Sequence, residues 1–291
     1  MSGSCCSPSA DRQPAGDLPI AGSSRGPTAR GLVAVPGGEL LMGSDSPEAY
    51  PQDGESPVRA VQIEPFAIGA TTVTNAEFAA FVDATGHVTE AEHFGDALVF
   101  AALVTPESEP RGAVAATPWW RVVPGASWRA PHGPGSDVTD LLDHPVTQVS
   151  HRDAAVYAAW VGGRLPTEQE WEWAARGGLV QQPFPWGAER EPDGEPRMNT
   201  FVGEFPVPGG EVGTVAADAF APNAFGLHNT TGNVWEWTAS PFSDWDRRPV
   251  LRGGSYLCHD SYCRRYRTSA RTANSPDTAL GHTGFRVASD G

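Results

Sequence analysis

Glycine and proline interrupt this chain so often that long regular elements have little room to form. The 291 residues include 33 glycines and 27 prolines, and only 19% of the residues are charged. Ten tryptophans are spread along the same chain, and each indole needs a large apolar environment. Abundant turn formers and many tryptophans together predict a globular protein held more in loops than in long helices or strands.

Short apolar runs predict several strands near the beginning of the folded region. Residues 32–35 and 39–43 flank the turn Pro36-Gly37-Gly38, and apolar residues recur two apart between Val61 and Ile68. After Gly178 no helical pattern persists. We therefore expect one mixed α+β domain over residues 31–291, preceded by a disordered N-terminal tail over residues 1–30.

Three helices are predicted by capping boxes, in which a hydroxyl and a carboxylate three residues later satisfy each other's free backbone amides. The predicted boxes and stops are Thr74 with Glu77 ending at Gly86, Ser150 with Asp153 ending at Gly162, and Thr167 with Glu170 ending at Gly177. Apolar residues at helical spacing follow each box and would face the core.

The charge balance limits the partners of the protein. A net charge of −15 argues against a nucleic-acid partner, because phosphates demand a basic surface. The sequence shows neither the apolar segment of a signal peptide nor a membrane span, so we expect a cytoplasmic protein without a membrane partner. In a reducing compartment its four cysteines would remain thiols.

Cys258 and Cys263 are the sequence feature with the most direct chemical meaning. They lie five residues apart beside Arg264, Arg265 and Arg267, whose positive charge would favour thiolates if it folds back toward the sulfurs. The spacing alone leaves a structural disulfide, half of a zinc site or no role open. Two soft sulfur donors would also suit monovalent copper and leave room for a third, incoming thiolate.

The other two cysteines, Cys5 and Cys6, belong to the run Cys5-Cys6-Ser7-Pro8-Ser9 in the predicted tail. Such a run is either an incidental tail sequence or a device for metal delivery or thiol exchange.

Five sequence motifs occur in an order that resembles the formylglycine-generating enzyme (sulfatase-modifying factor) superfamily. They are Val35-Pro36-Gly37-Gly38-Glu39, Arg164-Leu165-Pro166-Thr167-Glu168, Gly232-Asn233-Val234-Trp235-Glu236-Trp237, Leu251-Arg252-Gly253-Gly254-Ser255 and Gly284-Phe285-Arg286. The resemblance covers residues 31–289 and implies an irregular α+β fold related to C-type lectins. The segment from Ser255 to Arg267 is similar to the active-site segment of the active enzymes, whereas inactive paralogues lack the cysteines.

The resemblance implies aerobic, copper-dependent oxidation of the cysteine in a Cys-x-Pro-x-Arg motif of a sulfatase to Cα-formylglycine. Cys258 and Cys263 would hold Cu(I), and the substrate thiolate would join them. The partners would be molecular oxygen and an unfolded or nascent sulfatase polypeptide, and open access for this client favours a monomer with a surface cleft.

The resemblance also assigns roles to residues around the cysteine pair. Ser255 and Tyr256 would line the oxygen pocket, and Trp235 would pack beneath the copper site. Asp96 would pair with the substrate arginine, and Trp119 would stack on the motif. The peptide would bind as an extended strand.

Calcium is the second implied cofactor. The second site of the family corresponds to the side chains of Asn229 and Glu236 with the carbonyls of Gly232 and Val234, which are the oxygen ligands that a hard cation prefers.

The chain departs from the family pattern in three places. Asn199 and Thr200 of the first calcium site are present, but residues 206–214 are shortened and lack its aspartate. His282 stands where the family usually has an asparagine that contacts the substrate backbone. The loop at residues 240–249 is short, which would expose the approach to the cysteines.

Three functions therefore compete. The first is the copper oxidase of sulfatase cysteines, and the second is a lectin-like binding module without turnover. The third is a copper oxidase of another thiol, which His282 and the altered loops would allow.

Overall fold

Strands of two to eight residues carry most of the regular structure in the computed structural model, which describes residues 8–9, 26, 28–29 and 31–290. The strands are β1 (Leu32–Val35), β2 (Gly38–Met42), β3 (Arg59–Ile63), β4 (Phe66–Gly69), β5 (Asp96–Phe100), β6 (Gly112–Val114), β7 (Thr117–Pro124), β8 (Gly203–Glu204), β9 (Val207–Pro208), β10 (Trp235–Pro241), β11 (Pro249–Arg252), β12 (Arg271–Ala273), β13 (Thr283–Phe285) and β14 (Ala288–Asp290). The expected α+β fold with little regular structure is confirmed.

The helices are α1 (Asn75–Thr85), α2 (Glu90–Phe94), α3 (His151–Trp160) and α4 (Glu168–Arg176), with single 3-10 turns at Pro51–Asp53, Ala101–Leu103 and Pro192–Gly194. All three predicted capping boxes are present at the first turns of α1, α3 and α4. Helix α3 is capped by Val161, one residue before the predicted glycine. The short helix α2, with its own box from Thr89 to Glu92, was not predicted.

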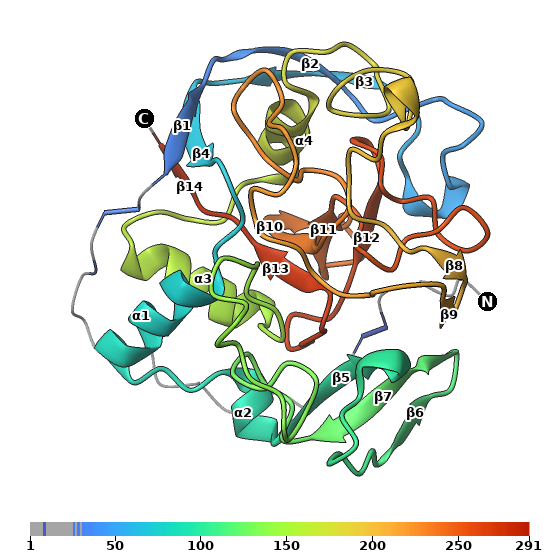
Figure 1. The fold of residues 1–291 in the computed structure, drawn as a ribbon. Coiled ribbons are helices and arrows are strands. Elements are labelled where there is room, and N and C mark those ends of the chain that lie inside the picture. The colour runs from blue at the N-terminus through green and yellow to red at the C-terminus, as the bar shows by residue number, and fades with distance from the viewer. Residues whose placement is uncertain (1–7, 10–25, 27, 30, 291) are drawn as a thin grey trace.

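A four-stranded sheet of order β12-β11-β10-β13 lies at the centre of the molecule (Figure 1). Strand β10 pairs antiparallel with β11 and parallel with β13, from Trp235 opposite Thr283 to Trp237 opposite Phe285. Around it lie the sheet β1-β4-β14, the pairs β2-β3 and β8-β9, and the sheet β5-β7-β6, which forms the lower edge in Figure 1.

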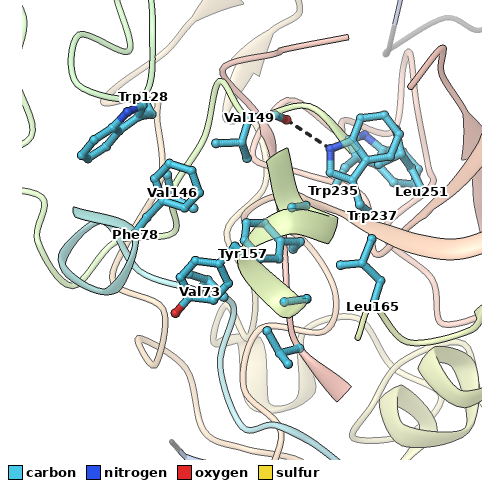
Figure 2. Packing of buried hydrophobic residues seen from close by; sticks show 14 of the residues in the cluster. Val73, Phe78, Trp128, Val146, Val149, Tyr157, Leu165, Trp235, Trp237 and Leu251 are labelled. Atoms are coloured by element: carbon cyan, nitrogen blue, oxygen red, sulfur yellow. Dashed lines mark hydrogen bonds between the residues drawn. The ribbon is translucent and has the colours of Figure 1, made fainter. Parts of the chain in front are cut away.

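The main hydrophobic core joins α1 and α3 to the central sheet. Phe78 stacks on Tyr157 with ring centroids 5.9 Å apart, and the indole N–H of Trp237 donates to the Val149 carbonyl at 3.2 Å (Figure 2). Trp235, Cys258 and Cys263 belong to the same buried cluster. The core therefore supports the cysteine segment directly.

Most of the predicted N-terminal tail, including Cys5 and Cys6, lies outside the described residues. Its described part contacts the domain, because Gly26 N and Ala29 N donate to the carbonyls of Trp160 and Val161 at 2.9 and 3.1 Å. Residues 26 and 29 therefore contact the domain although they precede its predicted start at residue 31. Within the described ranges no helix combines the length and apolarity needed to cross a bilayer.

Candidate active site

Two glycines turn the chain from the end of β11 into the cysteine segment. Gly253 and Gly254 have φ of +97° and +75°, which L side chains rarely adopt. A Cβ at Gly254 would lie 2.8 Å from the Arg265 carbonyl oxygen. This close approach folds the segment back on itself, so that Ser255 N donates to Cys258 Sγ at 3.4 Å.

The structure brings the two cysteines together as thiols. Cys258 Sγ and Cys263 Sγ lie 3.4 Å apart, well beyond the roughly 2.0 Å of a disulfide bond, and both side chains are fully buried. The disulfide interpretation is therefore wrong. Two converging soft donors fit monovalent copper in chemical type.

Arg265 places a positive charge beside the sulfur pair. Its Nη1 lies 3.7 Å from Cys263 Sγ, and its Nε and Nη2 donate to the two Asp53 carboxylate oxygens at 2.5 and 3.0 Å. The ring of Tyr50 covers the guanidinium at 4.2 Å. The expectation of a neighbouring cation is confirmed for Arg265, and the residues that hold it come from a loop 212 positions earlier.

The other two arginines of the segment connect it to the loop at residues 50–55. Arg267 donates to both oxygens of the buried Glu55 at 2.7 Å, and the backbone N–H of Arg264 donates to the Tyr50 hydroxyl at 3.0 Å. Asp53, Glu55 and Tyr50 were all missed by sequence reasoning. No local pattern marks them, because their partners lie more than two hundred residues away.

Ser255 connects the cysteine segment to His282. Ser255 Oγ lies 2.9 Å from His282 Nδ1, and it also accepts from Leu257 N at 3.2 Å. Burial lowers the pKa of His282 to about 3, so the ring is neutral at pH 7. The ring lies edge-on to Trp120, with centroids 4.7 Å apart.

The buried position of His282 differs from the predicted contact with substrate backbone. Its side chain has no exposed surface. The reason is local, because Trp235 N donates to the His282 carbonyl at 2.8 Å and ties this residue to β10. His282 therefore acts on the site through its contact with the Ser255 hydroxyl. Tyr256 is also buried, and its hydroxyl donates to the Gly281 carbonyl at 3.0 Å.

Three half-buried aromatic side chains lie next to the cysteine pair. Phe205 from the β8-β9 turn stacks on Tyr262 with centroids 4.2 Å apart. Trp119 lies edge-on to both rings, at 5.2 and 4.9 Å. Tyr262 directly precedes Cys263 and packs against the buried cluster that contains both cysteines, so it joins this aromatic group to the cysteine segment. That Trp119 stacks on the substrate motif stays a prediction, and Phe205 was not among the predicted site residues.

Asp96 and Trp119 lie toward opposite ends of the β5-β7 pair. Asp96 is opposite Pro124, and Phe100 at the other end of β5 is opposite Trp120. The Asp96 carboxylate accepts a hydrogen bond from Arg111 Nη1 at 3.0 Å. The predicted arginine-binding carboxylate therefore already receives a guanidinium from its own chain.

The predicted calcium donors also make contacts within the chain. Both oxygens of Glu236 accept from Arg286, at 2.6 and 2.7 Å, and one also accepts from the Trp171 indole at 2.7 Å. This buried pair offsets the charge of the carboxylate, and a calcium ion at Glu236 stays a prediction. The Asn229 amide oxygen is buried without a hydrogen-bond partner in the described chain, and it offers one possible ligand atom for a metal ion.

The side chains predicted for the first calcium site also contact other parts of the chain. Asn199 Nδ2 donates to the Gly213 carbonyl at 2.8 Å, and the Thr200 hydroxyl accepts from Arg190 at 3.1 Å. Gly232 and Val234 contribute only backbone at the turn before β10. Over the described ranges no group of three or more histidines, cysteines and carboxylates gathers in metal-binding geometry.

The fold and the site together define a class, that of irregular α+β proteins built around a paired-cysteine segment. The family model described as "Sulfatase-modifying factor enzyme 1-like domain" matches residues 20–291, and the chain belongs to this family. The expected family is thereby confirmed.

Curated relatives extend the similarity to nearly the whole chain. The chain is 50% identical to the formylglycine-generating enzyme of Thermomonospora curvata, covering 95% of this chain and 99% of that protein. It is 49% identical to the formylglycine-generating enzyme of Streptomyces coelicolor, covering 94% and 95%. The solved structure of PvdO from Pseudomonas aeruginosa shares the fold, with a TM-score of 0.64 at 24% identity over 89% of this chain and 94% of that one.

Proposed function

We propose that this protein is an oxidase that converts the cysteine of a Cys-x-Pro-x-Arg motif in sulfatase polypeptides to Cα-formylglycine, with copper held by Cys258 and Cys263. The observation that carries the proposal is the pair of buried thiols with sulfurs 3.4 Å apart. They lie in a chain about half identical to relatives named formylglycine-generating enzyme.

Copper, when bound, would supply the electron transfer to molecular oxygen that no side chain performs. The protein's own part is to hold two thiolates together in a buried site. Arg265 offsets part of their negative charge, and the Ser255 N–H donates to the Cys258 sulfur. Burial among Trp235 and its neighbours keeps water away from the sulfurs.

A cavity of about 120 Å³ is lined in part by Tyr256, Gly281 and His132. Tyr256 connects this cavity to the cysteine segment, which agrees with its proposed place in an oxygen pocket. Molecular oxygen would reach the site from this side, and the peptide would arrive from the aromatic group formed by Trp119, Phe205 and Tyr262.

The β5-β7 pair has the length to read the substrate motif. The cysteine and arginine of Cys-x-Pro-x-Arg lie four residues apart, which corresponds to about 13 Å in an extended chain. Strand β5 also spans four residue steps, from Asp96 to Phe100 opposite Trp120. Residues 97–100 of β5 are themselves buried, so the peptide would lie outside this strand, with its arginine at Asp96 and its cysteine near Tyr262, which adjoins Cys263.

The test is conversion of a peptide by the full chain. Protein loaded with Cu(I) is mixed under air with a peptide containing Cys-Thr-Pro-Ser-Arg, and the mass loss of a cysteine-to-aldehyde conversion is followed. We expect conversion by the wild type, none by Cys258→Ser or Cys263→Ser, and full conversion by the control Cys5→Ser. Copper binding without conversion would indicate oxidation of another thiol, and absence of copper binding would indicate a binding module.

A further inference from the structure

Arg111 of this chain contacts the carboxylate that is proposed to bind the arginine of the client motif. Its Nη1 donates to Asp96 Oδ2 at 3.0 Å. Arginine side chains recognise carboxylates through such charged hydrogen bonds, whether they belong to the protein or to a peptide. Arg111 and the arginine of a client would therefore bind to the same group.

Arg111 meets Asp96 across the middle strand of the sheet β5-β7-β6. Asp96 is opposite Pro124 on β7, and Gly112, the residue after Arg111, is opposite Val122 on the other side of β7. The backbone of Arg111 is fixed there, because its N–H donates to the Val122 carbonyl at 2.9 Å. Neighbouring strands lie about 4.8 Å apart, so the two side chains together span about 10 Å across β7.

The two partners differ in their exposure to water. The Arg111 side chain is 63% exposed, whereas that of Asp96 is 14% exposed. An exposed arginine gains little from an ion pair, because water screens its charge and the long side chain loses freedom when it is held. Asp96 begins the paired strand β5, so its carboxylate keeps its place when the Arg111 side chain turns away.

Replacement of Arg111 by the arginine of a client exchanges one guanidinium for another. The client gains the contact with Asp96, while Arg111 loses the same contact to water. The arginine of the client therefore adds less to binding than it would add if position 111 carried no charge. Because specificity is a difference between two affinities, this competition lowers the preference for clients with arginine.

We propose that Arg111 is a specificity-determining residue, which competes with the arginine of the client for Asp96 and reduces the dependence of binding on that arginine. This proposal rests on the function proposed for the site. A client motif without arginine leaves the pair of Arg111 and Asp96 intact and binds through its other contacts.

Two peptides that differ only in the charge of one residue test the proposal on the full chain. They are fluorescent Ser-Thr-Pro-Ser-Arg and Ser-Thr-Pro-Ser-citrulline, in which serine replaces the reactive cysteine so that anisotropy follows binding without turnover. Selectivity is the dissociation constant of the citrulline peptide divided by that of the arginine peptide. We expect Arg111→Met to raise this ratio about threefold, which corresponds to one exposed ion pair, and Arg111→Lys to leave it near the wild-type value.

Two further variants separate competition from a general effect of charge. Arg129→Met removes the same charge from a different exposed pair, that of Arg129 with Asp83, and should leave the ratio unchanged. Asp96→Asn should lower the ratio, and adding Arg111→Met to it should have no further effect, because the competition needs the carboxylate.

The same ratio in Arg111→Met, Arg129→Met and the wild type, or no measurable binding of either peptide, would overturn the proposal. Conversion of Cys-Thr-Pro-Ser-Arg by the wild type loaded with Cu(I) is measured separately. If conversion occurs while the ratio stays constant, the oxidase function stands and the role of Arg111 falls. If conversion fails while Arg111→Met raises the ratio, the oxidase function falls and the competition for Asp96 stands.

Discussion

At the scale of single residues, the site depends on contacts among three side chains, those of Asp53, Arg265 and Cys263. Asp53 holds Arg265 through two hydrogen bonds, and Arg265 in turn lies 3.7 Å from Cys263 Sγ. Both ends of the Asp53–Arg265 pair are nearly inaccessible to water. A buried guanidinium needs such a partner, because an unpaired charge in the interior is costly.

Removing the Asp53 charge should therefore destabilise the protein strongly. We expect Asp53→Asn to lower the free energy of unfolding by about 3 kcal/mol, since it leaves Arg265 buried without a full counter-charge. Urea denaturation measures the change. The control is Asp83→Asn, whose side chain is 75% exposed in a 3.5 Å pair with Arg129 and should cost less than about 0.5 kcal/mol. Equal effects of the two variants would contradict the account of the Arg265 site.

The sequence could predict half of this arrangement. Arg264, Arg265 and Arg267 stand beside the cysteines in the chain, so a neighbouring positive charge was foreseeable. Nothing local distinguishes Arg265 among the three. The folded chain distinguishes them, because Asp53 pairs with Arg265 and Glu55 pairs with Arg267. These carboxylates lie next to the arginines only after folding.

At the scale of elements, local hydrogen bonding made the helices predictable. A capping box involves only four consecutive residues, and all three predicted boxes form. Helix α4 shows how such an element serves the site. It presents Glu168 and Glu172 to Arg252 at 3.1 and 2.5 Å, and Arg252 directly precedes the two glycines that turn the chain into the cysteine segment.

The sheet β5-β7-β6 was not predicted, although it carries Asp96 and Trp119. Strand β6 has three residues, and its pairing with β7 shifts register between Ala113 and Val114. Such short, irregular strands show too little alternation of apolar and polar residues to be predicted from the sequence. The family resemblance supplied Asp96 and Trp119 as site residues, and the structure shows that one strand pair connects them.

The first residue of α3 should make stability depend on pH. Burial lowers the pKa of His151 from 6.5 to about 4, and its neutral ring donates to the Thr238 carbonyl at 3.1 Å. Because the folded pKa is the lower one, the unfolded chain takes up the proton first as the pH falls. Stability is therefore lost between pH 6.5 and about 4, by about 2–3 kcal/mol from this group.

The variant His151→Gln isolates this contribution, because glutamine can also donate to the Thr238 carbonyl. Urea denaturation of both proteins at pH 7 and pH 4.5 gives the comparison. The wild type should lose more stability than the variant over this range. Parallel losses would show that His151 does not titrate as its buried position requires.

At the scale of the whole molecule, short elements are held together by contacts between distant parts of the chain. The central sheet joins β10 to β13 in parallel, and the loop at residues 50–55 reaches across to the cysteine segment. Composition predicted the loop-rich character, and the motifs predicted the family. The exact partners of the buried arginines could not be predicted, because each contact joins segments that the sequence keeps far apart.

The net charge of −15 belongs to the same scale. Such a surface attracts a client segment that carries arginine, and it repels nucleic acid. The proposed monomer with an open peptide site would suit a polypeptide client that approaches the aromatic group of Trp119, Phe205 and Tyr262.

The central claim is that Cys258 and Cys263 together hold one copper ion. Titration of Cu(I) against a chromophoric chelator measures stoichiometry and affinity independently of turnover. We expect one tightly bound Cu(I) per chain in the wild type and in the Cys5→Ser control, and loss of this binding in Cys258→Ser and in Cys263→Ser. Tight binding retained in either of the latter two variants would contradict a shared copper site.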